Sequence, residues 1–224
     1  MSDLIRVSDR ADAVVTLTLN RPESKNALSI ALRDEMSDRL AEIAGDERVK
    51  VAIVTGAGDL FSAGFDLKEF QRVGEREFAD RIWASSDRFH RTLIEFPLPT
   101  IAAVNGPAMA GGCDLAMMCD LRIAAESASF SHPEVAFGTV AYGLLHDLLG
   151  GAVARELTLT GRVVESEEAR ALGLVTRVVP SEELASAARE LADRIAARPR
   201  SVLLSDKQKI IRRSSNTLRG TLDL

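Results

Sequence analysis

Aromatic residues and cysteine are both scarce in this chain of 224 residues. Aromatic residues make up 4% of the sequence and hydrophobic residues 46%, so the core has to be built mainly from Val, Leu, Ile and Ala. The two cysteines, Cys113 and Cys119, are six positions apart. On one helix they would point to different faces and could not form a disulfide. Two free thiols fit a reducing compartment.

Long apolar runs and an excess of basic charge are also missing. No run reaches the ~18 residues that a membrane-spanning helix needs, and residues 1–4 lack the basic and then apolar layout of a signal peptide. The net charge of −5 offers no basic face to a nucleic acid, although a local group of Lys and Arg side chains would still suit an anionic small molecule. We therefore expect a cytoplasmic protein with no nucleic-acid or membrane partner.

The chain instead contains a succession of strand-like and helix-like segments that fits one domain. Strands are predicted at 14–19, 49–55, 100–104 and 121–125, and helices after Ser29 and at 75–95, 112–119, 167–172, 181–195 and 201–213. Ser29, Ser166 and Ser181 are each expected to cap the helix that follows. The polar residues 214–220 are expected to be frayed. This order predicts an α/β core with helices appended at the C-terminal end.

Two segments rich in small residues follow predicted strands. The first is Phe-Ser-Ala-Gly-Phe-Asp-Leu-Lys-Glu at 61–69, and the second is Gly-Pro-Ala-Met-Ala-Gly-Gly-Cys-Asp at 106–114. Small residues leave peptide N–H groups uncovered. Two such turns, brought together, would offer two donors to one oxygen, which is the usual way to stabilise a carbonyl oxygen that gains charge in a transition state.

Other kinds of site fit the sequence less well. Gly56-Ala57-Gly58 resembles the start of a dinucleotide-binding loop, but Phe61 stands where that loop needs a third small residue. No Gly-x-Ser-x-Gly elbow occurs, which argues against a serine hydrolase. The three histidines, His90, His132 and His146, lack the spacing of metal ligands, so no metal site is predicted.

Two carboxylates are of more interest. Asp114 directly follows the second glycine turn, and Glu134 lies in the segment Ser-His-Pro-Glu-Val at 131–135. Each is followed by apolar residues. A carboxylate in such surroundings is paired, caps another group, or is tuned for proton transfer. Two of them near an oxyanion hole could hold a water or move a proton beside a carbonyl.

Several motifs occur in order between residues 4 and 210. They are 19–22 with 26–28, 62–67, 101–106 running through 111–116 to 119–120, 168–169 and 173–175. Together they resemble the crotonase family, the enoyl-CoA hydratase/isomerase superfamily. The resemblance implies a crotonase-like spiral of ββα repeats over residues 1–180, containing an acyl-CoA site. A C-terminal helical segment, 181–224, would be shorter than is usual for the family.

The resemblance also implies what the chain binds and how it assembles. The family acts on acyl-CoA thioesters, and no cofactor is implied because CoA is part of the substrate. A homotrimer or a hexamer of two trimers is implied, and we expect Leu184, Leu191 and Ile195 to lie partly against a neighbouring subunit.

Individual residues take their expected roles from the same resemblance. The peptide N–H groups of Phe65 and Gly111 would form the oxyanion hole. Asp114 and Glu134 match the two glutamates that hydratases use on water and on the α-carbon. The positions that line the substrate match Lys25, Ala27, Ala63, Asp66, Leu67 and Tyr142.

The expected activity is the hydration of a 2-enoyl-CoA, with Glu134 as the main acid/base and Asp114 assisting. Two departures from the family keep alternatives open. Asp114 replaces a glutamate, which withdraws the carboxylate by roughly 1.5 Å, one C–C bond, and Tyr142 replaces a glycine beside the catalytic water. The alternatives are a Δ3–Δ2-enoyl-CoA isomerase that uses Glu134 alone and a non-catalytic acyl-CoA-binding homologue.

Overall fold

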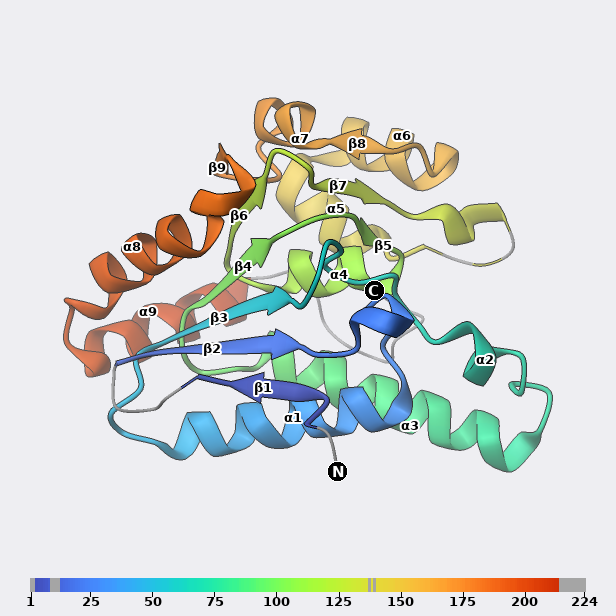
Figure 1. Cartoon of the computed structure of the whole chain (residues 1–224), viewed down its shortest axis with the longest axis horizontal. Coiled ribbons are helices and arrows are strands. Elements are labelled where there is room, and N and C mark those ends of the chain that lie inside the picture. The colour runs from blue at the N-terminus through green and yellow to red at the C-terminus, as the bar shows by residue number, and fades with distance from the viewer. Residues whose placement is uncertain (1–2, 9–12, 137, 139, 214–224) are drawn as a thin grey trace.

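The structure is a computed structural model that describes residues 3–8, 13–136, 138 and 140–213 (Figure 1). In these residues a six-stranded sheet has the order β1-β2-β3-β4-β6-β9. Its strands are β1 (Ile5–Val7), β2 (Val14–Leu19), β3 (Val51–Gly56), β4 (Thr100–Val104), β6 (Leu121–Ala125) and β9 (Arg177–Val179). β1 is antiparallel to β2, and the other neighbours are parallel. The carboxyl ends of β2, β3, β4 and β6 therefore meet at one edge, where the glycine turns follow.

A second, smaller sheet lies beside the first. It has the order β5-β7-β8, and its strands are β5 (Ala108–Met109), β7 (Ser129–Ser131) and β8 (Val164–Glu165). The chain passes from β4 in the large sheet to β5 in the small one, and again from β6 to β7, with a helix between the two passes. This repeated strand–strand–helix path is a spiral, and it confirms the predicted α/β fold class.

The helices enclose the sheets. They are α1 (Ile30–Gly45), α2 (Leu67–Phe70), α3 (Arg76–Ile94), α4 (Gly111–Met118), α5 (Tyr142–Leu149), α6 (Gly151–Thr160), α7 (Ser166–Leu172), α8 (Leu184–Ala196) and α9 (Arg200–Arg213). Short 3-10 turns lie at η1 (Pro22–Ser24), η2 (Pro133–Ala136) and η3 (Ser181–Glu183). None of the helices in the described part of the chain combines the length and hydropathy needed to cross a membrane. The segment 214–220 lies outside the described residues.

The strands of the large sheet send alternate side chains to two separate cores, as a sheet covered on both faces requires. Leu17 and Val54 belong to the core that α1, α3 and α4 cover, while Val51 and Ile53 belong to the core that α8 covers. Leu184 is buried in this second core, and Leu191 and Ile195 pack against it. The contacts described for these residues are therefore with the chain's own sheet, and the expectation that they face a neighbouring subunit gains no support.

The three expected helix caps have different outcomes. The Oγ of Ser29 accepts the N–H of Leu32 at 3.3 Å, so this serine caps α1 as predicted. Ser166 instead lies inside α7 and donates from Oγ to the carbonyl of Glu126. Ser181 lies in η3, where its hydroxyl contacts that of Ser127. The last two predictions were wrong because tertiary partners took the hydroxyls that sequence spacing had assigned to the helix ends.

Candidate active site

The two glycine turns lie directly side by side. Ser62 and Ala108 form a parallel β-bridge, and the N–H of Met109 donates to the carbonyl of Ser62 at 2.9 Å. Gly64 has a φ of +85°, and a Cβ added there would lie 2.8 Å from the Cβ of Ala110. The left-handed backbone and the close approach both require glycine at this position.

The residues expected to form the oxyanion hole are brought together. Gly111 is the first residue of α4, and a Cβ on it would lie only 3.2 Å from Cδ2 of the Phe65 ring. Within the described part of the chain, the peptide N–H groups of Phe65 and Gly111 make no hydrogen bond. The Gly111 N–H also lies at the positive end of a helix dipole. Both groups are thus available to an oxygen placed between the turns.

A third loop, which follows β2, holds the first turn in place. The N–H of Ala63 donates to the carbonyl of Lys25 at 3.0 Å, and the Oγ of Ser62 donates to the carbonyl of Asn26 at 2.9 Å. The buried amide of Asn26 donates to the carbonyls of Ala57 and Leu60 at 2.9 and 2.8 Å. Lys25 and Ala63, both expected to line the substrate, are therefore neighbours, and the Lys25 side chain is exposed.

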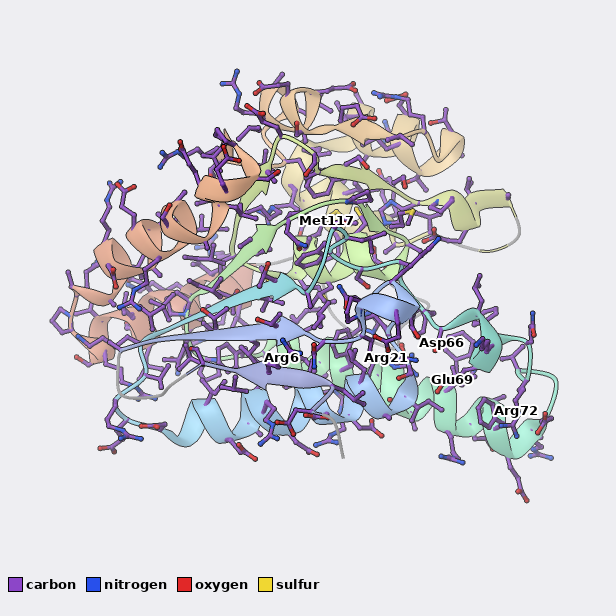
Figure 2. The ribbon with its side chains drawn as sticks, in the orientation of Figure 1. Arg6, Arg21, Asp66, Glu69, Arg72 and Met117 are labelled. Carbon is purple, nitrogen blue, oxygen red and sulfur yellow. The ribbon has the colours of Figure 1, made fainter. Side chains whose placement is uncertain are left out.

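Asp66 and Ala27 meet through a common partner, Arg21. Both terminal nitrogens of Arg21 lie 3.1 Å from Oδ2 of Asp66, and Nη1 also donates to the carbonyl of Ala27 at 2.8 Å. Figure 2 shows Arg21 and Asp66 on neighbouring segments, with Glu69 close by. Glu69 accepts the N–H of Ile30 at the start of α1. The carboxylate of Asp66 is thus engaged by Arg21 within the protein. If Asp66 contacts the substrate, we expect the contact to come from its backbone.

The two remaining expected substrate-binding residues differ in position. Leu67 begins α2 and is 65% exposed, which is unusual for a large apolar side chain and leaves it free to contact a ligand. Tyr142 begins α5. Its ring centroid lies 5.6 Å from that of His146 on the same helix.

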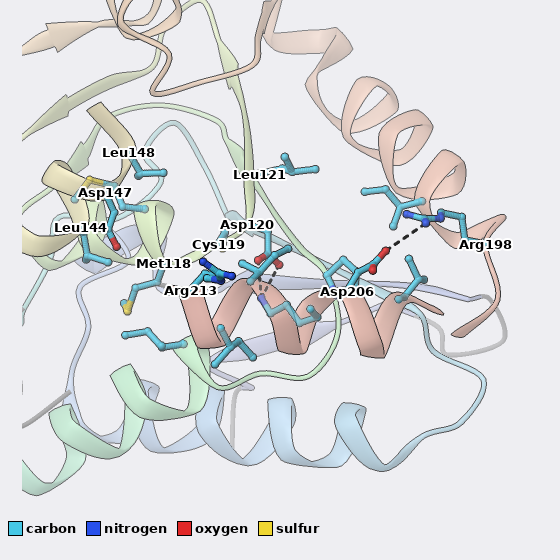
Figure 3. Close-up of a pocket in the computed structure, with 18 residues that line it drawn as sticks. Met118, Cys119, Asp120, Leu121, Leu144, Asp147, Leu148, Arg198, Asp206 and Arg213 are labelled. Atoms are coloured by element: carbon cyan, nitrogen blue, oxygen red, sulfur yellow. Dashed lines mark hydrogen bonds and ion pairs between the residues drawn. The ribbon is translucent and has the colours of Figure 1, made fainter. Parts of the chain in front are cut away.

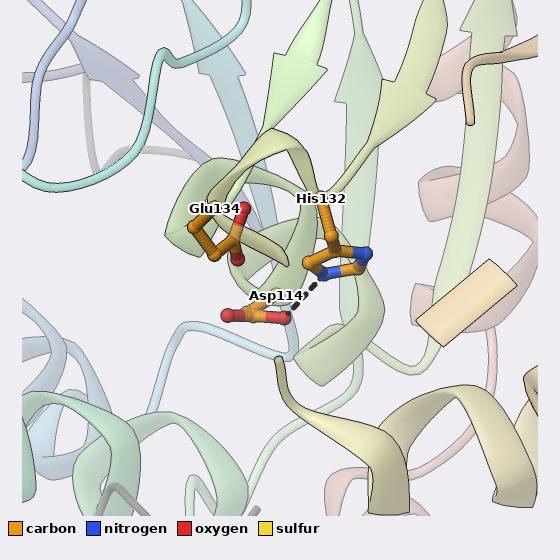
Figure 4. A group of neighbouring side chains, drawn as sticks. All are labelled: Asp114, His132 and Glu134. Atoms are coloured by element: carbon orange, nitrogen blue, oxygen red, sulfur yellow. Dashed lines mark hydrogen bonds and ion pairs between the residues drawn. The ribbon is translucent and has the colours of Figure 1, made fainter. Parts of the chain in front are cut away.

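The carboxylates of Asp114 and Glu134 converge, as the sequence predicted, and His132 joins them (Figure 4). Each of the three side chains places one polar atom within 4.8 Å of the others. Nε2 of His132 is 2.9 Å from Oδ1 of Asp114, and their side chains are 4% and 11% exposed. Oε2 of Glu134 is buried and makes no hydrogen bond to any described residue. Glu134 therefore lies beside the pair with one buried oxygen that has no partner among the described residues.

Burial and charge shift the proton equilibria of this group. Burial raises the pKa of Glu134, and the charge of Asp114 adds to that shift, while His132 opposes it. For His132, burial lowers the pKa, but the hydrogen bond and charge of Asp114 together with Glu134 outweigh it and leave the pKa raised. A glutamic acid that keeps its proton at higher pH than usual suits a proton donor.

Side chains of these three types can also bind a divalent cation. The 2.9 Å separation of His132 Nε2 and Asp114 Oδ1 is the length of a direct hydrogen bond. The group is therefore arranged as a hydrogen-bonded pair facing a carboxyl. The prediction that the protein holds no metal stays a prediction.

His132 is the site residue that sequence reasoning missed. In the sequence it is one of three histidines that lack the spacing of metal ligands. Its partner Asp114 is 18 residues away and approaches because β7 pairs with β5, the strand that leads into α4. The one available signal was its position two residues before Glu134 in a segment already selected for its carboxylate.

A pocket of about 700 Å³ opens beyond the carboxylates, between α4, α5 and α9 (Figure 3). Its lining is mostly apolar and includes Met117, Met118, Leu144 and Ile210. Met117 and Met118 lie three and four residues after Asp114 on α4, so they continue the helix face that carries the carboxylate. Met117 and Met118 thus lie about one helical turn along α4 from Asp114, and none of Asp114, His132 and Glu134 lines the pocket itself.

The spiral fold, the paired turns and the two facing carboxylates define a class of acyl-CoA enzyme, and comparison with known proteins agrees. The family model described as enoyl-CoA hydratase/isomerase matches residues 9–224. The chain belongs to this family.

Individual relatives are similar over most of their length. The short-chain-enoyl-CoA hydratase of Clostridium acetobutylicum is 36% identical over 211 residues, 92% of this chain and 80% of that protein. The crotonyl-CoA hydratase of Syntrophomonas wolfei subsp. wolfei is 37% identical over 197 residues, 86% of this chain and 75% of that protein. A crystal structure of an enoyl-CoA hydratase from Bacillus anthracis superposes with a TM-score of 0.85 at 37% identity, covering 92% of this chain and 82% of that one.

Proposed function

We propose that the protein is an enoyl-CoA hydratase, which adds water across the 2,3 double bond of a 2-enoyl-CoA thioester. The observation that carries the proposal is the arrangement on α4. Its first residue offers the Gly111 N–H beside Phe65, and Asp114 follows within one turn and faces Glu134. The names of the relatives support the same reaction.

In the proposed reaction the thioester oxygen accepts the N–H groups of Phe65 and Gly111. These donors stabilise the charge that develops as the enolate forms, and losing one donor of this kind costs about 10²–10³ in rate. A water held by Asp114 and Glu134 adds its oxygen to C3. Glu134 supplies the proton to C2, and the carboxylates take up the proton that the water releases. The reaction needs no separate cofactor, because CoA is part of the substrate.

The binding of CoA is proposed to use the loops around Lys25, Ala63 and Leu67. Lys25 contributes an exposed cation suited to a phosphate, and Leu67 an exposed apolar surface. The acyl chain is proposed to extend past Asp114 into the pocket lined by Met117 and Met118. We expect Met118→Trp to lower kcat/KM for a long 2-enoyl-CoA by roughly tenfold relative to crotonyl-CoA, with Met118→Leu as the control. An equal effect on both substrates would remove the pocket from the proposal.

Isomerisation of a 3-enoyl-CoA is the second candidate. The state of Glu134 favours it, because this reaction can use Glu134 alone, and its Oε2 makes no hydrogen bond to any described residue. The deciding experiment follows crotonyl-CoA hydration and 3-enoyl-CoA isomerisation separately. In a hydratase, Asp114→Asn and Glu134→Gln each suppress turnover. In an isomerase, Asp114→Asn retains most activity. An absence of both activities with retained CoA binding would instead identify a non-catalytic homologue.

We also propose a homotrimer or hexamer in a reducing, cytoplasmic setting. Exposed apolar side chains at Leu159 and Val163, 78% and 50% accessible, give a surface that a neighbour would cover. Cys113 and Cys119 are both buried free thiols, which fits a reducing compartment. Light scattering across a range of concentrations tests the assembly, and a constant monomer mass would reject it.

A further inference from the structure

His132 is a buried ionisable residue to which the proposed reaction assigns no task. It follows β7, whose last residue, Ser131, accepts the N–H of Ala110 at 2.9 Å. Ala110 is the N-cap of α4 and has a φ of +50°, an unusual conformation for alanine. The backbone that carries His132 is therefore tied to the residue that precedes the Gly111 N–H. A displacement of His132 would therefore change the positions of both Asp114 and the Gly111 N–H.

The contact between His132 and Asp114 determines which oxygen of the carboxylate is open. Nε2 of His132 lies 2.9 Å from Oδ1, so a proton on Nε2 occupies that oxygen. The side chain of Asp114 is short, and its Oδ1 is engaged by His132. This contact restrains the carboxylate in one orientation. Only Oδ2 remains for a ligand.

We propose that His132 is a positioning residue, which donates from Nε2 to Oδ1 of Asp114, holds that carboxylate in one orientation, and leaves Oδ2 to hold the water. The proposal rests on the proposed hydration reaction. It also separates the tasks of the two carboxyls. Asp114 orients the water as a fixed acceptor, and Glu134 carries the exchangeable proton.

The surrounding charges support this division. Glu134 faces the pair from η2, and Cys113 from α4. Burial raises the pKa of the Cys113 thiol well above its usual value, so it stays neutral. His90, on α3, feels the charge of Asp114, but burial lowers its pKa, so it too is neutral near pH 7. Arg162 lines the small cavity that His132 shares, although its own ion pairs are with Glu156 and Glu168.

His132 is therefore the group best placed to offset two carboxylates that lie within 4.8 Å of one another. When it is protonated, the three side chains share one positive charge against at most two negative charges. Because the groups interact strongly, their titration belongs to the cluster as a whole. Removal of the imidazole should therefore change the pH dependence of turnover as well as its size.

The kinetic experiment compares His132→Gln with His132→Leu. The amide of glutamine can still donate to Asp114 but cannot titrate, whereas leucine can do neither. We expect His132→Leu to lower kcat for crotonyl-CoA hydration by about 10², the cost of a misplaced reacting group, with KM for the substrate almost unchanged. His132→Gln should recover most of kcat but lose one ionisation from the pH profile. His146→Gln, which replaces an exposed side chain on α5, is the matched control. Wild-type kcat in a folded His132→Leu protein would overturn the proposal.

A second measurement does not depend on turnover. The chain has three histidines, so the imidazole resonances can be assigned with single His→Gln variants and titrated by NMR. The resonance of His132 should titrate above the ordinary value of ~6.5 and shift to lower pH in Asp114→Asn. An unchanged titration in that variant would reject the pair, even if His132→Leu does not fold. If wild-type protein fails to hydrate crotonyl-CoA while this coupling is present, the proposed function fails and the pair stands.

Discussion

The guanidinium carbon of Arg33 lies 4.6 Å from the centroid of the Phe65 ring, in a cation–π contact beneath the first glycine turn. Arg33 is 1% exposed. Its nitrogens donate to the carbonyls of Leu28 and Ile82 at 2.6 and 3.2 Å. Leu28 in turn donates its N–H to the carbonyl of Gly64. A buried cation on α1 thus supports the peptide whose N–H is proposed to bind the thioester oxygen.

Replacement of Arg33 should lower the rate of catalysis, because it would disturb the position of Phe65. Burial lowers the pKa of Arg33 to about 10, so the side chain is still charged at pH 7. Arg33→Met leaves buried carbonyls unpaired, at a cost of about 2 kcal/mol in stability, and lets the Phe65 turn shift. We expect kcat for crotonyl-CoA to fall roughly tenfold, less than the loss of a whole oxyanion donor. Arg33→Lys keeps the positive charge but lacks the several N–H donors of the guanidinium, so its kcat should lie between those of wild type and Arg33→Met. Unchanged kcat in a folded Arg33→Met protein would contradict this role.

Glu134→Gln should abolish turnover and yet stabilise the protein at neutral and basic pH. Burial raises the pKa of Glu134, so the folded state binds this proton more tightly than the unfolded state. The resulting stability is complete below the ordinary glutamate pKa of ~4.3 and is lost as the pH rises through the raised value. The neutral amide avoids that loss, so the variant should melt a few degrees above wild type at pH 8. The difference should vanish at pH 4, and an equal difference at both pH values would count against the buried charge as its cause.

Lys25 should contribute to the binding of CoA through charge. Its side chain is exposed beside the Ala63 turn. Lys25→Ala should weaken the binding of free CoA by about 1 kcal/mol, roughly fivefold in Kd. Added salt should weaken wild-type binding more than variant binding, because a phosphate contact is screened. Lys209→Ala on α9 removes a remote, exposed cation and is the control. Isothermal titration that finds no CoA binding to wild-type protein would remove the acyl-CoA proposal itself.

The last described helix is fastened to the sheet by a buried ion pair. Nζ of Lys207 lies 2.7 and 2.6 Å from the two oxygens of Asp120, and Oδ2 also accepts the N–H of Thr100. Lys207 is 3% exposed. Removal of one partner leaves a buried charge, so Lys207→Met should destabilise the protein by about 3–5 kcal/mol. Lys207→Met with Asp120→Asn should cost less than the sum of the single variants in denaturant titrations. Strict additivity would show that the pair is not coupled.

Much of this architecture could be predicted where local signals were strong. The strands at 100–104 and 121–125 have their predicted bounds, because each is an apolar run with a clear turn on either side. Helix α1 could be predicted from the Ser29 cap and a regular buried face. The paired glycine turns could be predicted from their small residues alone. In the structure those residues allow the two turns to approach closely, as at Gly64 and Ala110.

The short strands and the role of His132 could not be predicted, because they depend on contacts between segments that are distant in the sequence. The strand β9 has three residues and one exposed position, and it forms only because Ile123 pairs with Arg177. Strands β5 and β8 have two residues each, too few to show a period. His132 was missed for the same reason, because nothing in its immediate neighbours indicates a bond to Asp114.

The order of the strands has a consequence for synthesis on the ribosome. From β1 to β6, each strand of the large sheet pairs with the strand of that sheet that precedes it in the chain. A nascent chain can therefore extend the sheet from its first edge as residues emerge, without waiting for distant segments. β6 is then an open parallel edge until β9 is released, and open edges are the places where incomplete chains pair wrongly. The interval between the release of Ala125 and that of Arg177 is the period in which a chaperone would have the most to protect.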